Sequence, residues 1–286
     1  MIAGNLLGNY SALTGTVFVV ILLIGIEWLT TEDKSPNQIT DTTVPNAILA
    51  LHVLFHTAAI VSLIYGIESH ILEGRFILFA ALSTGINSGI EGINSAHEMI
   101  HRKQQGWQLC GIWNLMLVNY GHFFIEHVKG HHRYVGTMRD PATARYGESF
   151  YLFFLRTVPQ QYLSALIIES ERLEKTNRFG FTLSNFVIRI TLLEALLCLC
   201  IYLLFGKIIA AAYLYQSLVA FFLLEYVNYI EHYGLVREEG KKVNPAHSWQ
   251  SDMPISRFAL IELSRHSDHH IREQAGPRNA RALGPD

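Results

Sequence analysis

Five apolar stretches of this sequence are long enough to cross a lipid bilayer, which takes roughly 20 residues of helix. They cover 14–30, 46–66, 76–96, 186–205 and 208–230. Half of all residues are hydrophobic and only 16% are charged, which is unlike an average soluble domain. We therefore expect an all-α polytopic transmembrane helical bundle. Residues 1–286 should form a single membrane-embedded domain, with 271–286 as a flexible tail.

A sixth apolar segment, 107–127, is interrupted by polar residues and glycine. If it crossed the membrane, the histidines before and after it would face opposite sides. We expect instead a re-entrant or interfacial hairpin, whose backbone must be covered by protein. With this topology, one side of the membrane carries only Arg75 and Lys207 of the 22 basic residues. The positive-inside bias then places the other side, with a histidine-rich cap, in the cytoplasm.

Nine histidines lie in four groups on the expected cytoplasmic side, within the segments HEMIH, EHVKGHH, IEHYG and RHSDHH. They are His97, His101, His127, His131, His132, His232, His266, His269 and His270. Within each group that has several, the spacing of three to five residues predicts imidazoles on one helical face.

The first group, taken alone, is an H-E-x-x-H motif. Such a motif predicts a zinc peptidase, with Glu98 as general base. One catalytic zinc, however, takes three protein ligands and a water. Nine imidazoles suit two metal ions with four or five ligands each, and imidazole is compatible with Zn, Cu, Fe or Ni.

The four groups, in this order, are similar to the histidine boxes of the membrane alkane 1-monooxygenases. The similarity continues through GINSAHEMIHRK, RDPATARYGESFYLFFLRT and ERLEK, and covers roughly residues 80–270. This family belongs to the integral-membrane fatty acid desaturase and hydroxylase superfamily. Its members usually have six spanning helices, so the resemblance implies that this chain lacks an N-terminal helix.

The resemblance implies a non-haem di-iron monooxygenase. Two irons per chain would be held by the nine box histidines, O2 would be the co-substrate, and rubredoxin with its reductase would supply electrons. The implied reaction converts the terminal methyl group of medium-chain n-alkanes, taken from the bilayer, to a primary alcohol. The implied location is the bacterial inner membrane, with the active site on the cytoplasmic side.

Four alternatives stay open. Two belong to the same superfamily: desaturation or hydroxylation of fatty acyl chains, and oxidation of an aromatic methyl group such as that of xylene. The other two are a zinc intramembrane peptidase and a non-catalytic metal-binding membrane protein.

Each histidine group also contains an acidic residue. These are Glu98, Glu126, Glu231 and Asp268. A metal-bound imidazole commonly donates its other N–H group to a carboxylate, which fixes its tautomer and orientation. We expect the four acids to have this role rather than to bind the metal directly. His52 and His56 match no box, and we expect a buried, hydrogen-bonded or substrate-channel role for them rather than a third metal site. His70, His122 and His247 stand apart from the boxes and are not among the expected ligands.

The net charge and the motifs limit which partners the protein can have. A net charge of −2 gives no support to nucleic-acid binding. The three cysteines form no C-x-x-C pair and no G-x-G-x-x-G loop is present, so electrons must come from separate proteins. Basic residues on the cytoplasmic side are predicted to attract an acidic carrier. They include Lys129, Arg133, Arg139, Lys241 and Lys242.

Overall fold

The computed structural model describes residues 1–35, 43–267 and 269–270, and the regular secondary structure of this part is entirely helical. Four helical stretches are long and apolar enough to cross a membrane. They are Asn9–Glu27, α4 (Thr43–Glu68), Arg75–Ile100 and α11 (Phe186–His232). The first comprises η1 (Asn9–Leu13), α2 (Thr14–Val17), η2 (Phe18–Leu23) and α3 (Ile24–Glu27), and the third α5 (Arg75–Asn87), η3 (Ser88–Ile93) and α6 (Asn94–Ile100). The predicted all-α membrane fold is confirmed.

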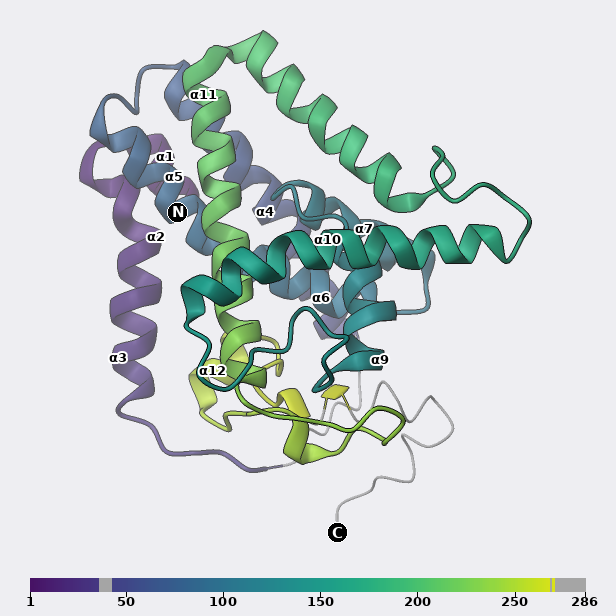
Figure 1. Ribbon diagram of the computed structural model, residues 1–286. Coiled ribbons are helices and arrows are strands. Elements are labelled where there is room, and N and C mark those ends of the chain that lie inside the picture. The colour runs from purple at the N-terminus through teal and green to yellow at the C-terminus, as the bar shows by residue number, and fades with distance from the viewer. Residues whose placement is uncertain (36–42, 268, 271–286) are drawn as a thin grey trace.

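The long helix α11 consists of two arms that meet at Gly206. This residue has φ 82° and ψ 176°, a backbone conformation that glycine adopts readily and other residues do not. The chain rises along the first arm and returns along the second (Figure 1). The arms correspond to the predicted stretches 186–205 and 208–230, so all five apolar stretches are helical.

Glycines allow the membrane helices to approach closely. A Cβ atom on Gly85 of α5 would lie 2.6 Å from Cβ of Val219 in the second arm of α11. A Cβ atom on Gly92 of η3 would lie 2.6 Å from Cε1 of His56 in α4. Larger side chains at these positions would push α4 and α11 away from the helix that carries the first histidine group.

The apolar segment 107–127 returns to the side on which it begins. Its helix α7 (Gln105–Met116) has 12 residues, or roughly 18 Å, which is too short for a hydrocarbon core of about 30 Å. Beyond a turn lie α8 (Phe123–Ile125), η4 (Glu126–His131) and α9 (His132–Tyr134). The ring centroids of His101 and His127, which flank the segment, are 5.1 Å apart. This geometry agrees with the predicted hairpin.

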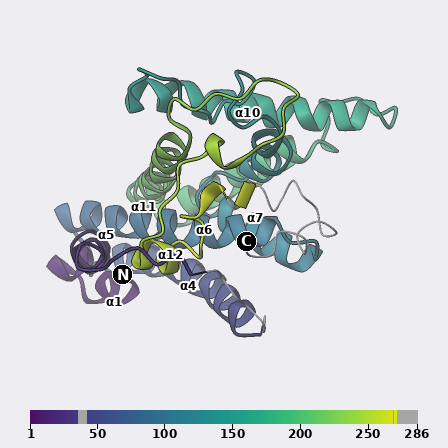
Figure 2. The same ribbon diagram turned by 90° about the horizontal axis from the view of Figure 1, so that it is seen from below.

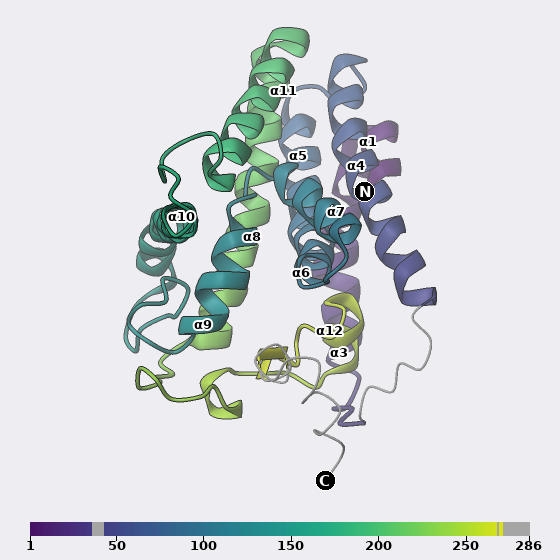
Figure 3. The same ribbon diagram turned by 90° about the vertical axis from the view of Figure 1, so that its right-hand side faces the viewer.

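Helix α10 (Phe150–Glu174) has no counterpart among the predicted elements. It runs across the second arm of α11 rather than along it (Figure 1), and Figure 3 shows it on the side opposite α4. One of its faces is buried, but the outer face exposes Leu152, Leu155, Leu163 and Ile167. A helix with an exposed apolar stripe is typical of the membrane interface. Hydropathy did not reveal it, because charged residues such as Arg156 and Glu169 interrupt the apolar pattern.

The C-terminal segment crosses the end of the bundle that carries the histidines. It contains η5 (Pro245–His247) and α12 (Pro254–Ala259), and the view from below shows it passing under α11 and α6 (Figure 2). This path brings the fourth histidine group under the other three.

Candidate metal centre

The nine box histidines gather in two clusters, within each of which the candidate ligand atoms lie within 4.8 Å of one another. The five-histidine cluster contains His97, His101, His127, His132 and His269. The four-histidine cluster contains His131, His232, His266 and His270. Of the histidines that the structure describes, those outside the boxes join neither cluster.

In the five-histidine cluster, imidazoles from α6, η4, α9 and the C-terminal segment converge. Nε2 of His132 lies 3.0 Å from Nε2 of His127 and 3.1 Å from Nε2 of His269. The ring centroids of His97 and His101 are 4.9 Å apart, one turn of α6 from each other. The cluster therefore joins three of the four histidine groups.

In the four-histidine cluster, Nε2 of His266 lies 3.1 Å from Nε2 of His232 and 2.9 Å from Nε2 of His270. His232 is the last residue of α11. The ring of His131 completes the cluster, 4.8 Å from that of His232 and 5.0 Å from that of His270. All four side chains are buried.

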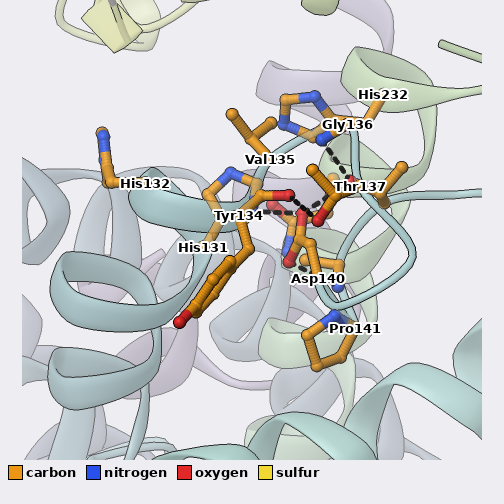
Figure 4. Close-up of polar contacts among 12 residues, drawn as sticks. His131, His132, Tyr134, Val135, Gly136, Thr137, Asp140, Pro141 and His232 are labelled. Carbon is orange, nitrogen blue, oxygen red and sulfur yellow. Dashed lines mark hydrogen bonds and ion pairs between the residues drawn. The ribbon is translucent and has the colours of Figure 1, made fainter. Parts of the chain in front are cut away.

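The second and fourth groups are divided between the clusters, which the expectation of one face per group did not anticipate. The residues of η4 form a π-helical turn, hydrogen-bonded from i to i+5, and this wider turn brings position i+5 nearer to the direction of position i than an α-helix does. His127 therefore meets His132, whereas His131 turns to the other cluster. The rings of His131 and His132 are nearly perpendicular and 5.9 Å apart, and their side chains lie well apart in Figure 4.

Two histidines of the four-histidine cluster have their outer nitrogen fixed by an oxygen acceptor. Nδ1 of His131 lies 2.9 Å from Oδ2 of Asp140 (Figure 4), and Nδ1 of His232 lies 3.3 Å from the carbonyl oxygen of His247. Donation of the Nδ1 proton leaves the lone pair of Nε2 free to face the cluster. Asp140 was missed in the sequence analysis, although its segment RDPATARYG carries part of the family resemblance.

The structure describes three of the four expected acidic partners. Glu98 accepts hydrogen bonds from its neighbour Arg102, at 3.2 and 3.3 Å. The carboxylate of Glu126 packs on Gly130, and burial raises its pKa to about 8. Oε2 of Glu231 lies 3.3 Å from Nε2 of His266, the nitrogen that faces the cluster. Asp268 lies outside the described residues.

The imidazoles have the chemistry that a metal ion requires. Burial, followed by the neighbouring imidazoles, holds the pKa values of four histidines well below their usual range, so the rings are neutral. They are His127, His132, His266 and His270. Two nitrogens bound at right angles to one ion, at about 2.1 Å each, lie roughly 3.0 Å apart, which matches the Nε2 distances. Nε2 of His97 and of His131 is buried without a hydrogen-bond partner among the described residues. The residues therefore fit two metal ions.

A basic pocket opens onto the five-histidine cluster. Its volume is about 460 Å³, and its lining includes His101, His132, Arg133, Arg237, Lys241 and Lys242. We call it the basic pocket. Lys129 and Arg139 lie elsewhere: Nζ of Lys129 is 3.0 Å from Oε1 of Glu169, and the guanidinium of Arg139 stacks over the Tyr134 ring. Of the basic residues named in the sequence analysis, Arg133, Lys241 and Lys242 therefore adjoin the histidines.

Comparison with known proteins agrees with this site. Residues 74–283 match the sequence model of a family described as fatty acid desaturase. Alkane 1-monooxygenase 1 of Alcanivorax borkumensis is 37% identical over 225 residues, which cover 77% of this chain and 55% of that protein. Alkane 1-monooxygenase 2 of Pseudomonas aeruginosa is 40% identical over 194 residues, which cover 66% of this chain and 52% of that protein.

A more distant relative bears on the alternative of oxidising an aromatic methyl group. The xylene/toluene monooxygenase hydroxylase component XylM of Pseudomonas putida is 30% identical over 215 residues, covering 73% of this chain and 58% of that protein. The chain thus spans about half the length of the curated relatives that it matches.

Proposed function

Because the chain belongs to the fatty acid desaturase family, and within that superfamily to the alkane monooxygenases, we propose that it is a di-iron enzyme that hydroxylates the terminal methyl group of medium-chain n-alkanes with O2. The observation that carries the proposal is the pair of clusters with five and four imidazoles. A peptidase would use three of these nine ligands. Glu98, which would be the general base of a peptidase, pairs with Arg102 instead.

Each cluster would hold one iron, which supplies the activation of O2 needed to attack an inert C–H bond. The chain's own residues orient the ligands. Asp140 and the His247 carbonyl oxygen hold His131 and His232 with Nε2 toward the cluster. Met99 and Ile100, which lie between His97 and His101 in the sequence, are buried and form an apolar side of the five-histidine cluster. An alkane dissolved in the bilayer would reach this end of the bundle along the membrane helices.

Electrons would come from rubredoxin and its reductase. The basic pocket supports this part of the proposal, because its cations adjoin His101 and His132 and would attract an acidic carrier. We place the pocket on the cytoplasmic side of a bacterial inner membrane, following the distribution of basic residues.

Iron analysis combined with product analysis tests the proposal. Purified protein should contain close to two irons per chain and, with rubredoxin, its reductase and NADH, should convert octane to 1-octanol. Fatty acyl substrates and xylene are assayed in parallel, since a preference for either would favour a related activity of the superfamily. One zinc and no iron would overturn the di-iron assignment.

A further inference from the structure

The three histidines of the fourth group serve both clusters. His269 belongs to the five-histidine cluster, and His266 and His270 belong to the four-histidine cluster. The position of one short segment therefore affects every ligand set in the protein.

An irregular turn separates the fourth group from helix α12. Helix α12 ends at Ala259, and the next residues include Ile261 and Glu262 with φ values of 51° and 65°. A β-branched residue in this left-handed region is strained, so the surrounding contacts must hold the backbone there.

Two arginines supply these contacts. Nη1 of Arg257 donates to Oδ2 of Asp33 at 2.7 Å, and Nη2 donates to Oε1 of Glu262 at 3.0 Å. Arg265, which directly precedes His266, donates from Nε to Oδ1 of Asp252 at 2.8 Å and from Nη1 to the carbonyl oxygen of Ser35 at 2.8 Å. The Arg257 and Arg265 side chains are only 7% and 10% exposed.

The partners Asp33 and Ser35 belong to the loop that follows the first membrane helix. The backbone adds to the attachment, because N–H of Asp33 donates to the carbonyl oxygen of Asp252 at 2.9 Å. N–H of Ser256 donates to Oε2 of Glu27, the last residue of α3, at 2.9 Å. The first membrane helix is thus tied to the segment that carries the fourth group, although more than 200 residues separate them in the sequence.

We propose that Asp33, Arg257 and Arg265 form a latch that positions the fourth histidine group for both metal ions. The proposal rests on the proposed metal binding. It assigns a positioning role to three residues that are not metal ligands themselves. If the Asp33 carboxylate is lost, the buried guanidinium of Arg257 keeps its charge but loses one of its partners. The segment that carries Arg257 and the fourth histidine group then shifts, because the charge must be solvated in another way. Metal sites require their ligands within about 0.5 Å, so such a shift weakens both clusters at once.

Cobalt(II) titration of the metal-free full chain, followed by visible absorption, tests the latch. We expect Asp33→Ala to weaken both binding events together by about tenfold, the lower end of the range for lost supporting contacts. Asp33→Glu keeps the carboxylate and should restore wild-type binding. Lys34→Ala is the matched control, because Lys34 is in the same loop but its side chain is 73% exposed, with Nζ 2.9 Å from Oε2 of the exposed Glu32. A general loss of structure would lower the melting temperature of the metal-free protein without recovery in Asp33→Glu.

The outcomes separate the latch from the proposed function. His232→Ala removes a ligand of one cluster and should weaken one binding event only, whereas a latch variant weakens both. Wild-type affinity and spectrum for both ions in Asp33→Ala would overturn the latch and leave the di-iron site standing. Failure of the wild-type protein to bind two cobalt ions would overturn the metal assignment itself. If Asp33→Ala is not recovered from membranes, Asp33→Asn removes the charge at nearly constant size and carries the same expectation.

Discussion

Nδ1 of His131 lies 2.9 Å from Oδ2 of Asp140, and the two side chains are 2% and 0% exposed. Burial alone would raise the pKa of Asp140, but the nearby His131 and hydrogen bonds from His131 and Thr143 hold that pKa below its usual value. The carboxylate is therefore charged at neutral pH. It fixes the imidazole with Nε2 directed at the four-histidine cluster.

We expect Asp140→Asn to weaken metal binding at the four-histidine cluster by roughly 10–100-fold, because the amide does not hold the Nδ1 proton as the carboxylate does. The measurement is metal content after dialysis against a graded series of chelator concentrations. Glu98→Gln is the control, since Glu98 pairs with Arg102 rather than with an imidazole. An effect of Glu98→Gln as large as that of Asp140→Asn would restore the original expectation for Glu98.

The division into two clusters makes a stoichiometric prediction. His232→Ala should leave the five-histidine cluster intact and yield close to one iron per chain, and His97→Ala should do the same by removing the other ion. Hydroxylation should be lost in both variants, because each removes a ligand. Iron analysis of the two purified variants checks this. Two irons per chain in either variant would show that the substituted histidine is not needed to bind an iron.

Histidine spacing and hydropathy predicted much of this architecture. The four boxes contain all nine clustered histidines, and in three of the boxes these histidines recur at helical intervals. Hydropathy located the five apolar helices, and the interruption at Gly206 and Lys207 marked the turn between the arms of α11. Both signals depend only on residues that are near one another in the sequence.

The features that sequence reasoning missed depend on tertiary structure. The π-helical turn of η4 decides which cluster His131 joins, and nothing in EHVKGHH distinguishes it from an α-helical turn. Asp140 reaches His131 through a loop nine residues away, so no helical spacing marks the pair. Glu98, which is next to a ligand in the sequence, pairs with Arg102 instead.

Acid should destabilise the metal-free protein. The pKa values of His127, His132, His266 and His270 are lowered in the folded state, first by burial and then by neighbouring imidazoles. The unfolded chain has histidine pKa values near about 6.5, so below this pH it binds more protons than the folded protein. The contribution of these histidines to the free energy of unfolding is thus fully present above pH ~6.5. It is lost below this pH, by up to about 1.4 kcal/mol per pH unit for each histidine. Melting temperatures between pH ~8 and ~5.5 check this, and a flat profile would contradict neutral imidazoles.

Electron delivery should depend on the basic pocket. We expect the double variant Lys241→Glu, Lys242→Glu to slow the oxidation of reduced rubredoxin by about tenfold or more at low salt, because charge steering raises association rates by 10–10³. Rising salt should slow the wild-type reaction in the same way, since screening shortens the reach of charges to about 3 Å at 1 M. Stopped-flow absorption of the carrier measures both effects. Lys175→Glu, at the end of α10, is the matched control. An equal effect of this change would show that electron delivery does not depend on the basic pocket.

Close packing between Gly92 and His56 should limit the residues allowed beneath the metal centre. A Cβ atom on Gly92 would lie 2.6–2.8 Å from three ring atoms of His56, so Gly92→Ala should destabilise the protein by about 1–3 kcal/mol. Gly25→Ala is the control, because no atom from elsewhere in the described part of the chain lies within 4 Å of its Cβ position, and alanine favours helix there. Removing the ring should relieve the overlap, so Gly92→Ala combined with His56→Ala should cost less than the sum of the single changes. Thermal melts of the four variants in detergent give this comparison, and strictly additive losses would show that the ring does not limit position 92.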